Sequence, residues 1–95
     1  MSKLLTEEQV SEALAKLDGW SRDGDSIVRT AELASFPAAI EAVRRVAEIA
    51  EARNHHPDID IRWRTLTFRC STHSEGGLTD KDVDLAAEIN RVLES

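Results

Sequence analysis

The sequence predicts an α+β domain of two layers, with its elements in the order α-β-β-α-β-β-α. Three stretches place apolar residues at helical spacing, and each begins near a capping or proline signal. Two pairs of short strand-like stretches lie between them, and a turn joins the members of each pair. Because such hairpins pair antiparallel, we expect a four-stranded antiparallel sheet with the helices packed on one face.

The first helix is expected from about Leu5 to Lys16. Thr6 and Gln9 have the spacing of a capping box, in which each side chain bonds the other residue's backbone N–H. Leu5 and Val10 stand where a hydrophobic staple would close, and Val10 begins an apolar repeat of helical period. These signals together predict that a helix opens the domain.

The first hairpin is expected directly after this helix. A short strand begins at Trp20, and Asp23-Gly24-Asp25 is a strong turn signal because glycine adopts positive φ without steric cost. The partner strand is expected over Ser26–Leu33, with Ile27 and Ala31 on one face.

The second helix is expected to be the longest, from about Pro37 to Arg53. Proline suits the first turn of a helix, and Asn54 suits the left-handed residue that ends one. One apolar stripe of this helix should face the core, and its members are Ile40, Val43, Ala47 and Ala50.

The second hairpin and a last helix complete the order. The alternating residues are Ile59, Ile61 and Trp63 in one strand and Leu66, Phe68 and Cys70 in the next. A tight turn near Arg64 explains the change of parity between them. Core packing is the expected environment of Trp63. Thr79-Asp80-Lys81-Asp82 resembles a second capping box, from which the last helix runs to the C-terminus.

Composition and charge limit the classes of function. The 95 residues suit one domain, residues 1–95, and 41% hydrophobic with 32% charged residues is typical of a soluble globular protein. The net charge of -6 and the pI near 5.0 argue against nucleic-acid binding, which needs a basic face. No apolar run suits a membrane span or a signal peptide, and the single Cys70 forms no internal disulfide. A cytoplasmic location is therefore expected.

All three histidines lie within the stretch from Glu51 to His73. Histidine can give or take a proton near neutral pH, so this clustering suggests a site that handles protons. His55 and His56 are adjacent at the junction of a helix end and a strand start, where neighbouring side chains point in different directions. The alternative for this pair is two surface histidines in a loop.

The second hairpin gives a geometric reason to group the histidines. Its arms from His56 to His73 have similar lengths, so its two ends should lie side by side. Three imidazoles would then meet at one mouth. Glu51 stands four residues before His55 and would orient that ring if the helix continues to Asn54. The alternative for Glu51 is a solvated helix residue.

Other candidates are weighed against structural roles. Zinc binding is disfavoured, because adjacent histidines rarely ligate one ion and neither a helical His pair nor a cysteine set supports it. Trp20 is expected either in the core or as an apolar wall for a flat heterocycle. Asp82 is first a helix-cap residue, and Cys70 is expected to be a small buried hydrophobe.

The sequence resembles the pterin-4a-carbinolamine dehydratase family over nearly its whole length. The resemblance is carried by Glu51, His55, His56, Pro57, Trp63, His73 and Asp82 at their mutual spacing, and by Leu17-Asp18-Gly19-Trp20 and Gly76-Gly77-Leu78-Thr79. It departs at Ala31 and Ile40, where bulkier aromatic residues are expected, and this affects packing more than chemistry.

The resemblance implies dehydration of 4a-hydroxytetrahydrobiopterin, a 4a-hydroxytetrahydropterin, to the quinonoid dihydropterin and water. That reaction belongs to tetrahydrobiopterin recycling and needs neither a cofactor nor a metal. By analogy His55 and His73 form the acid/base pair in either order, and His56 binds and orients the substrate. Glu51 would position His55, and Asp82 would shape the pocket. The polar edge of the pterin would bond the backbone of Pro57 and of Thr72, His73, Ser74 and Glu75.

The resemblance also leaves other classes of function open. Some family members bind the dimerisation helix of a transcription factor, so a helix-docking or structural homo-oligomer is one alternative. A dehydratase-like protein acting on another pterin is a second. The implied partners are a small pterin and further copies of the chain, as a dimer or tetramer.

Overall fold

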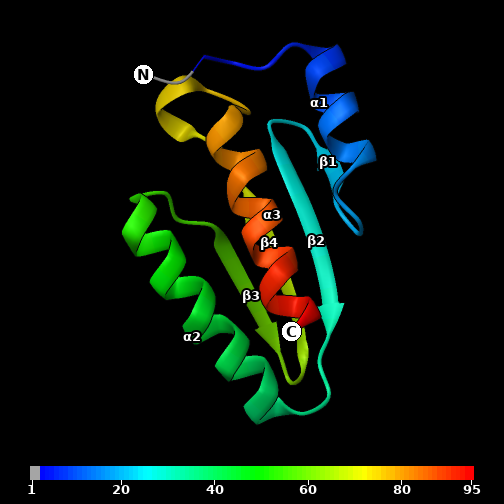
Figure 1. Ribbon diagram of the computed structural model, residues 1–95, viewed down its shortest axis with the longest axis vertical. Helices are drawn as coiled ribbons and strands as arrows, with labels where there is room; N and C mark the ends of the chain where they lie inside the picture. Colours follow the sequence, from blue (N-terminus) through cyan, green and yellow to red (C-terminus); the bar gives the residue numbers. More distant parts are fainter. Residues whose placement is uncertain (1–2) are drawn as a thin grey trace.

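The computed structural model describes residues 3–95 and has the predicted α+β order of elements (Figure 1). Residues 1 and 2 of the expected domain lie outside the described residues. The helices are α1 Glu7–Ala15, α2 Phe36–Arg53 and α3 Asp80–Glu94. The strands are β1 Ser21–Asp23, β2 Ser26–Glu32, β3 Asp58–Arg62 and β4 Thr65–Cys70, and a short 3₁₀ turn η1 spans His73–Glu75.

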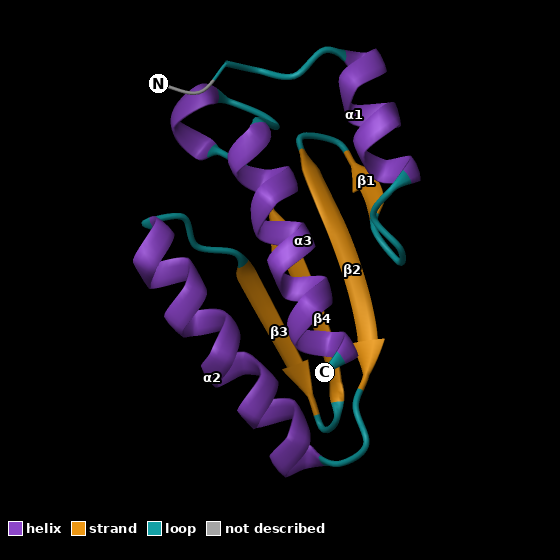
Figure 2. Ribbon diagram, in the orientation of Figure 1, coloured by secondary structure: helices purple, strands orange, loops and turns teal. Residues whose placement is uncertain are grey.

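The four strands form one antiparallel sheet in the order β1-β2-β4-β3 (Figure 2). The two central strands, β2 and β4, belong to different hairpins, with Ile27 opposite Cys70 and Ala31 opposite Leu66. Alternate residues of β4 face the helices, so Leu66, Phe68 and Cys70 are buried. Figure 1 shows α3 lying across β4, with α2 beside β3 and α1 beside β1. The helices therefore form one layer on one face of the sheet, as expected.

The core lies between β4 and the apolar faces of α2 and α3. Its fully buried helical side chains include Leu85, Ala86 and Ile89 of α3 and Val46 of α2. The opposite face of the sheet is polar, and there Thr30 and Thr67 share a hydrogen bond of 3.1 Å between their hydroxyls. α3 therefore lies directly over the hairpin that carries the histidines at its ends.

The caps that define the helices are those predicted. Thr6 and Gln9 form a complete capping box on α1, and Thr79 and Asp82 form another on α3. Asn54 ends α2 in the left-handed conformation, with φ 49° and ψ 43°. These are local hydrogen-bonding patterns, which explains why the sequence reveals them.

The buried face of α2 agrees with the predicted stripe at Ala50, with Val43 packed against the core, but differs from it at Ile40 and Ala47. Ala39, Ala42, Val46 and Ala50 are buried, whereas Ile40 is 42% exposed and Ala47 is also exposed. The helix is rich in apolar residues on two adjacent faces, so helical period alone does not choose between them. The face with the small alanines packs inward, because it lets the helix approach the rest of the core closely.

Trp63 is a turn residue and not a core residue. Arg62 pairs with Thr65, so Trp63 and Arg64 form the two-residue loop near the predicted position. Trp63 has φ 56° and is 72% exposed, and the Arg64 guanidinium lies 5.1 Å from its ring centroid. The predicted extension of the strand to Trp63 is therefore wrong, because a two-residue hairpin loop needs left-handed backbone there.

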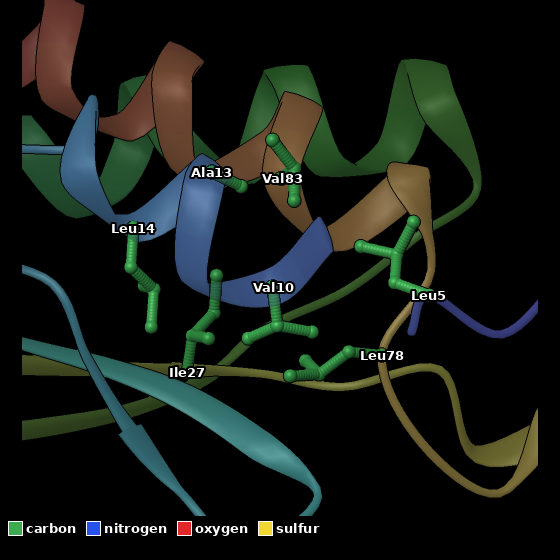
Figure 3. A pocket seen from close by; sticks show the side chains of 7 residues that line it. All are labelled: Leu5, Val10, Ala13, Leu14, Ile27, Leu78 and Val83. Carbon is green, nitrogen blue, oxygen red and sulfur yellow. The ribbon is translucent and has the colours of Figure 1, made fainter. Parts of the chain in front are cut away.

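The N-terminal segment and α1 pack on the rest of the domain mainly through apolar contacts, and Glu7 of α1 also pairs with Arg22 of β1. Leu5, Val10, Ala13, Leu14, Ile27, Leu78 and Val83 surround a small cavity of about 10 Å³ (Figure 3). A cavity this small and apolar has no room for a ligand and no polar partner for water. It is a packing junction, and the Leu5 N–H bonds the Leu78 carbonyl at 2.8 Å beside it.

None of the helices within residues 3–95 combines the length and the apolar character that crossing a bilayer requires.

Candidate active site

The open end of the β3–β4 hairpin carries the candidate site. The last strand pair there joins Asp58 to Arg69, so the residues before β3 and after β4 leave the sheet side by side. A pocket of about 340 Å³ lies at this end. Its lining residues are Asn54, His55, His56, Ser71, Thr72, His73, Ser74 and Lys81. The predicted meeting of three imidazoles at one mouth is confirmed.

His55 is held by a buried carboxylate from α3. Its Nε2 lies 2.6 Å from Asp82 Oδ1, and the His55 side chain is only 12% exposed while that of Asp82 is fully buried. An ionised carboxylate only accepts hydrogen bonds, so Nε2 carries the proton and donates. Nδ1 is then the ring nitrogen left to accept a proton.

Asp82 is itself held by two further donors. The Thr72 hydroxyl donates to Asp82 Oδ2 at 2.7 Å, and the Thr79 backbone N–H donates to the same oxygen at 3.0 Å. Three donors around a buried carboxylate supply the hydrogen bonds that burial takes from water. The carboxylate also sits in the first turn of α3, where the helix dipole favours negative charge.

Glu51 pairs with His56 and not with His55. Glu51 Oε1 lies 2.8 Å from His56 Nε2, at an exposed position where the side chains are 82% and 56% exposed. The expectation that Glu51 positions His55 is therefore wrong. Asn54 turns left-handed before His55, so the one-turn spacing of a helix no longer relates Glu51 to His55. The same turn directs the His55 ring toward α3.

His73 enters the pocket from the other end of the hairpin. It opens η1, and its carbonyl accepts the Gly76 N–H at 3.1 Å where Gly76 adopts φ 75°. A bridge between Thr72 and Gly77 closes this loop. Within residues 3–95 no hydrogen bond holds the exposed His73 ring, so its nitrogens are available to a bound molecule.

Comparison with known proteins now identifies the family. The family model described as pterin 4 alpha carbinolamine dehydratase matches residues 3–92. This chain belongs to that family. A relative from Nocardia farcinica is 58% identical over 91 residues and one from Mycobacteroides abscessus is 60% identical over 87 residues. These matches cover 96% and 92% of this chain and 96% and 93% of the relatives, and both are provisionally named pterin-4-alpha-carbinolamine dehydratase.

Solved structures agree on the fold. The crystal structure of a transcriptional coactivator/pterin dehydratase from Brucella melitensis has a TM-score of 0.93 and 31% identity, covering 96% of this chain and 99% of that one. A pterin dehydratase-like protein described as a RuBisCO assembly factor in the α-carboxysome has a TM-score of 0.66 at 13% identity, covering 80% and 88%. This second likeness shows the fold alone.

Not every residue expected to act in this dehydratase-family pocket lies in it. Trp20 is 6% exposed, and its Nε1 donates to Asn90 Oδ1 at 2.7 Å, two turns along α3 from Asp82. Of its two expected environments Trp20 therefore occupies the core, and its expected role as a wall of the pocket is wrong. Pro57 and Glu75 are half-buried neighbours of the pocket and do not line it.

The backbone of Thr72 is also not free for a substrate. Its N–H bonds the Gly77 carbonyl at 2.9 Å, and its carbonyl accepts from Glu75 and Gly76 at 3.0 and 3.1 Å. Thr72 takes part through its buried hydroxyl instead. Ser74 lines the pocket as expected.

Sequence reasoning missed three lining residues of the family pocket, which are Asn54, Ser71 and Lys81. The sequence patterns place Asn54 and Lys81 only in helix caps. A signal was present, because Lys81 precedes Asp82 in a first helical turn and Ser71 precedes the Thr72-His73 pair. Both therefore flank residues already grouped with the site.

The Cys70 thiol offers no second chemistry at this site. Burial, with the charge of Asp82 adding to it, raises the pKa of the Cys70 thiol to about 12, so the thiol stays protonated and unreactive. Among residues 3–95 no group of three or more His, Cys, Asp or Glu side chains is placed to hold a metal ion.

Proposed function

We propose that this protein dehydrates a 4a-hydroxytetrahydropterin to the quinonoid dihydropterin by histidine acid/base catalysis. Membership of the dehydratase family supports the reaction. The observation that carries the mechanism is the His55–Asp82 pair facing His73 across one pocket. The pocket volume of about 340 Å³ is at the lower end of the roughly 300–1,000 Å³ typical of small-molecule sites, which suits a two-ring substrate.

The reaction is an elimination of water without change of oxidation state. A base removes the N5 proton, and the N–H electron pair becomes the C4a=N5 double bond. The C4a–O bond breaks with its electron pair on oxygen, and an acid supplies the proton that makes the leaving group water. The step therefore needs one proton acceptor and one proton donor on the two sides of a ring. Each of the two proton transfers contributes about 10²–10⁴-fold to the rate.

His55 is suited to be the base. Asp82 fixes its proton on Nε2, which leaves Nδ1 as the acceptor, and the buried carboxylate stabilises the imidazolium that forms. His73 is suited to be the acid, because its exposed ring has no hydrogen bond within residues 3–95 and can follow the departing hydroxyl.

The pocket rim would orient the substrate. His56, whose Nε2 donates to the Glu51 carboxylate, also lines the pocket. The Ser74 side chain and the N–H groups of His73 and Ser74, which open η1, can bond the polar edge of the pterin, whereas the Glu75 N–H already bonds the Thr72 carbonyl.

A steady-state assay with the carbinolamine generated in situ tests this function. We expect wild-type turnover, and we expect His73→Ala to lower kcat well over tenfold while the protein stays folded, given the range for general acid–base catalysis. Thr67→Val, on the open face of the sheet, is a matched control that should keep the wild-type rate. Equal rates for His73→Ala and wild type would refute the assignment.

We further propose that the reaction serves tetrahydrobiopterin recycling in the cytoplasm. The family resemblance supports this choice of pterin. Turnover of a different pterin carbinolamine, with none of the biopterin form, would instead indicate a dehydratase for another pterin.

We also propose that the chain self-associates. Phe36 and Ile40 of α2 and Ile61 of the edge strand β3 are between 41% and 48% exposed, and Trp63 is more exposed still. Large exposed apolar residues and an unpaired strand edge favour association with a second copy. A docking role with another protein would use the same exposed side chains, so it competes with self-association.

A further inference from the structure

We propose that Thr72 and Thr79 are positioning residues whose hydroxyl groups fix the tautomer of His55. They act through Asp82, because the Thr72 hydroxyl bonds its carboxylate and the Thr79 hydroxyl bonds Thr72, and they do not touch the reacting atoms. The tautomer itself is a property of the folded chain, and its consequence for turnover rests on the proposed dehydratase function.

The hydrogen bonds form a chain with one direction. The Thr79 hydroxyl oxygen accepts the Lys81 N–H at 3.2 Å, and it lies 2.8 Å from the Thr72 hydroxyl oxygen. The Thr72 hydroxyl proton is committed to Asp82 Oδ2 at 2.7 Å, because a carboxylate only accepts. The Thr79 hydroxyl must therefore donate to Thr72. Every proton in the chain points toward the carboxylate.

Burial makes this chain difficult to replace with water. Thr72 is 3% exposed, and Thr79 and Asp82 are fully buried. When a donor is removed from such buried surroundings, its acceptor is left without a hydrogen bond. In an aligned chain of hydrogen bonds, each bond also strengthens its neighbours. The negative charge of Asp82 therefore depends on these donors and on the Thr79 backbone N–H.

Loss of the Thr72 hydroxyl has a defined consequence for His55. Asp82 Oδ2 would keep one donor, which favours a protonated carboxylic acid over a buried anion. Asp82 would take up a proton from solvent and donate it to His55 Nε2, while the ring gives up its own Nε2 proton and binds one on Nδ1, so that it stays neutral. The nitrogen left for the substrate would become a donor and could no longer act as the base.

The chain also joins the start of α3 to the catalytic base. Thr79 is the N-cap of α3, and Thr72 lies in the loop that leads to His73. The same few hydrogen bonds thus align the helix, the loop and the His55 ring.

The test uses four full-length proteins: wild type, Thr72→Val, Thr72→Ser and the control Thr67→Val. Valine removes the hydroxyl at nearly constant volume, and serine restores it. Thr67 offers the same substitution on β4, where the one hydrogen bond of its hydroxyl within residues 3–95 is to Thr30. Two readouts are taken, namely kcat and KM for the carbinolamine and the tautomer of neutral His55 from ¹⁵N NMR shifts of the ring.

We expect wild type, Thr72→Ser and Thr67→Val to show a proton on Nε2 and similar kcat. We expect Thr72→Val to move the proton to Nδ1 and to lower kcat by about tenfold or more, with KM changed by less than about threefold, because only the base is affected. Failure of Thr72→Ser to restore kcat and tautomer would overturn the proposal.

Two other outcomes decide the matter independently of activity. If His55 in the folded wild type carries its proton on Nδ1, the proposal is overturned, even if Thr72→Val fails to fold. An Nε2–H ring in wild type that persists in folded Thr72→Val overturns it as well. If wild type has no turnover but shows the expected tautomer switch, the proposed function fails and the positioning role stands.

Discussion

Replacement of Asp82 by asparagine separates the catalytic role of this residue from its structural role. Asparagine has the same shape but one acceptor oxygen and one NH₂ donor. Two donors, the Thr72 hydroxyl and the Thr79 N–H, meet at Oδ2, whereas among the described residues His55 is the one donor to Oδ1. The amide should therefore place its oxygen toward the two threonines and its NH₂ toward His55.

The expected cost in stability is small. The amide oxygen keeps the hydrogen bonds from Thr72 and Thr79, and with them the helix cap. These bonds are now between neutral groups and are worth roughly 1 kcal/mol each, whereas a hydrogen bond to a charged group is worth about 1.5–3 kcal/mol. We therefore expect Asp82→Asn to lower the free energy of unfolding by about 1–2 kcal/mol. A domain whose free energy of unfolding is roughly 5–15 kcal/mol stays folded after such a loss.

The expected cost in activity is large. The NH₂ group can only donate, so His55 must accept on Nε2 and carry its proton on Nδ1. Removing the base in this way should lower kcat by roughly 10²–10⁴-fold, the contribution of one general base. Urea unfolding gives the stability, and the carbinolamine assay gives kcat.

Two further variants control this experiment. Glu51→Gln changes the other carboxylate near the histidines in the same way, but the carboxylate of Glu51 bonds the exposed His56, so this variant should change kcat far less. Asp82→Ala leaves three buried donors without a partner and should cost at least about 3 kcal/mol. Wild-type kcat in folded Asp82→Asn would refute the account of His55 as an oriented base.

Two other predictions concern Cys70 and the exposed apolar residues. Because the pKa of the Cys70 thiol is raised from 9.0 to about 12, the thiol should resist iodoacetamide at pH 8 in the folded protein and react readily in urea. The free energy of unfolding should fall above about pH 9, because only the unfolded thiol ionises there. Rapid labelling of the native protein, measured by mass spectrometry, would contradict this prediction. Ile61→Lys on the edge strand should shift a self-associated chain toward monomer in sedimentation velocity. The loss of stability should be small, because Ile61 is 41% exposed. An unchanged sedimentation coefficient would exclude β3 as the contact between copies.

The order of elements could be read from the sequence because its signals are local. The capping boxes at Thr6 and Thr79 and the left-handed Asn54 each involve residues within one helical turn. The hairpin between His56 and His73 has its own turn and its own alternation, so the meeting of the histidines follows from arm lengths alone. Such patterns depend little on the rest of the chain.

The partner of each histidine could not be read in this way. Glu51 is four residues from His55, yet the ring bonds Asp82, which is 27 residues away. That choice depends on how α3 packs over β4 and on the direction that Asn54 gives to the chain. The buried face of α2 and the position of Trp20 against Asn90 also depend on packing between elements.

The sequence by itself determined the elements, their pairing within hairpins and the presence of three imidazoles at one end of β3 and β4. Only the tertiary structure decided that a buried carboxylate, held by Thr72 and Thr79, orients His55. The physical reason is that backbone hydrogen bonds and periodicity act over a few residues. The environment of a buried charge is instead assembled from segments that meet only when the domain has folded.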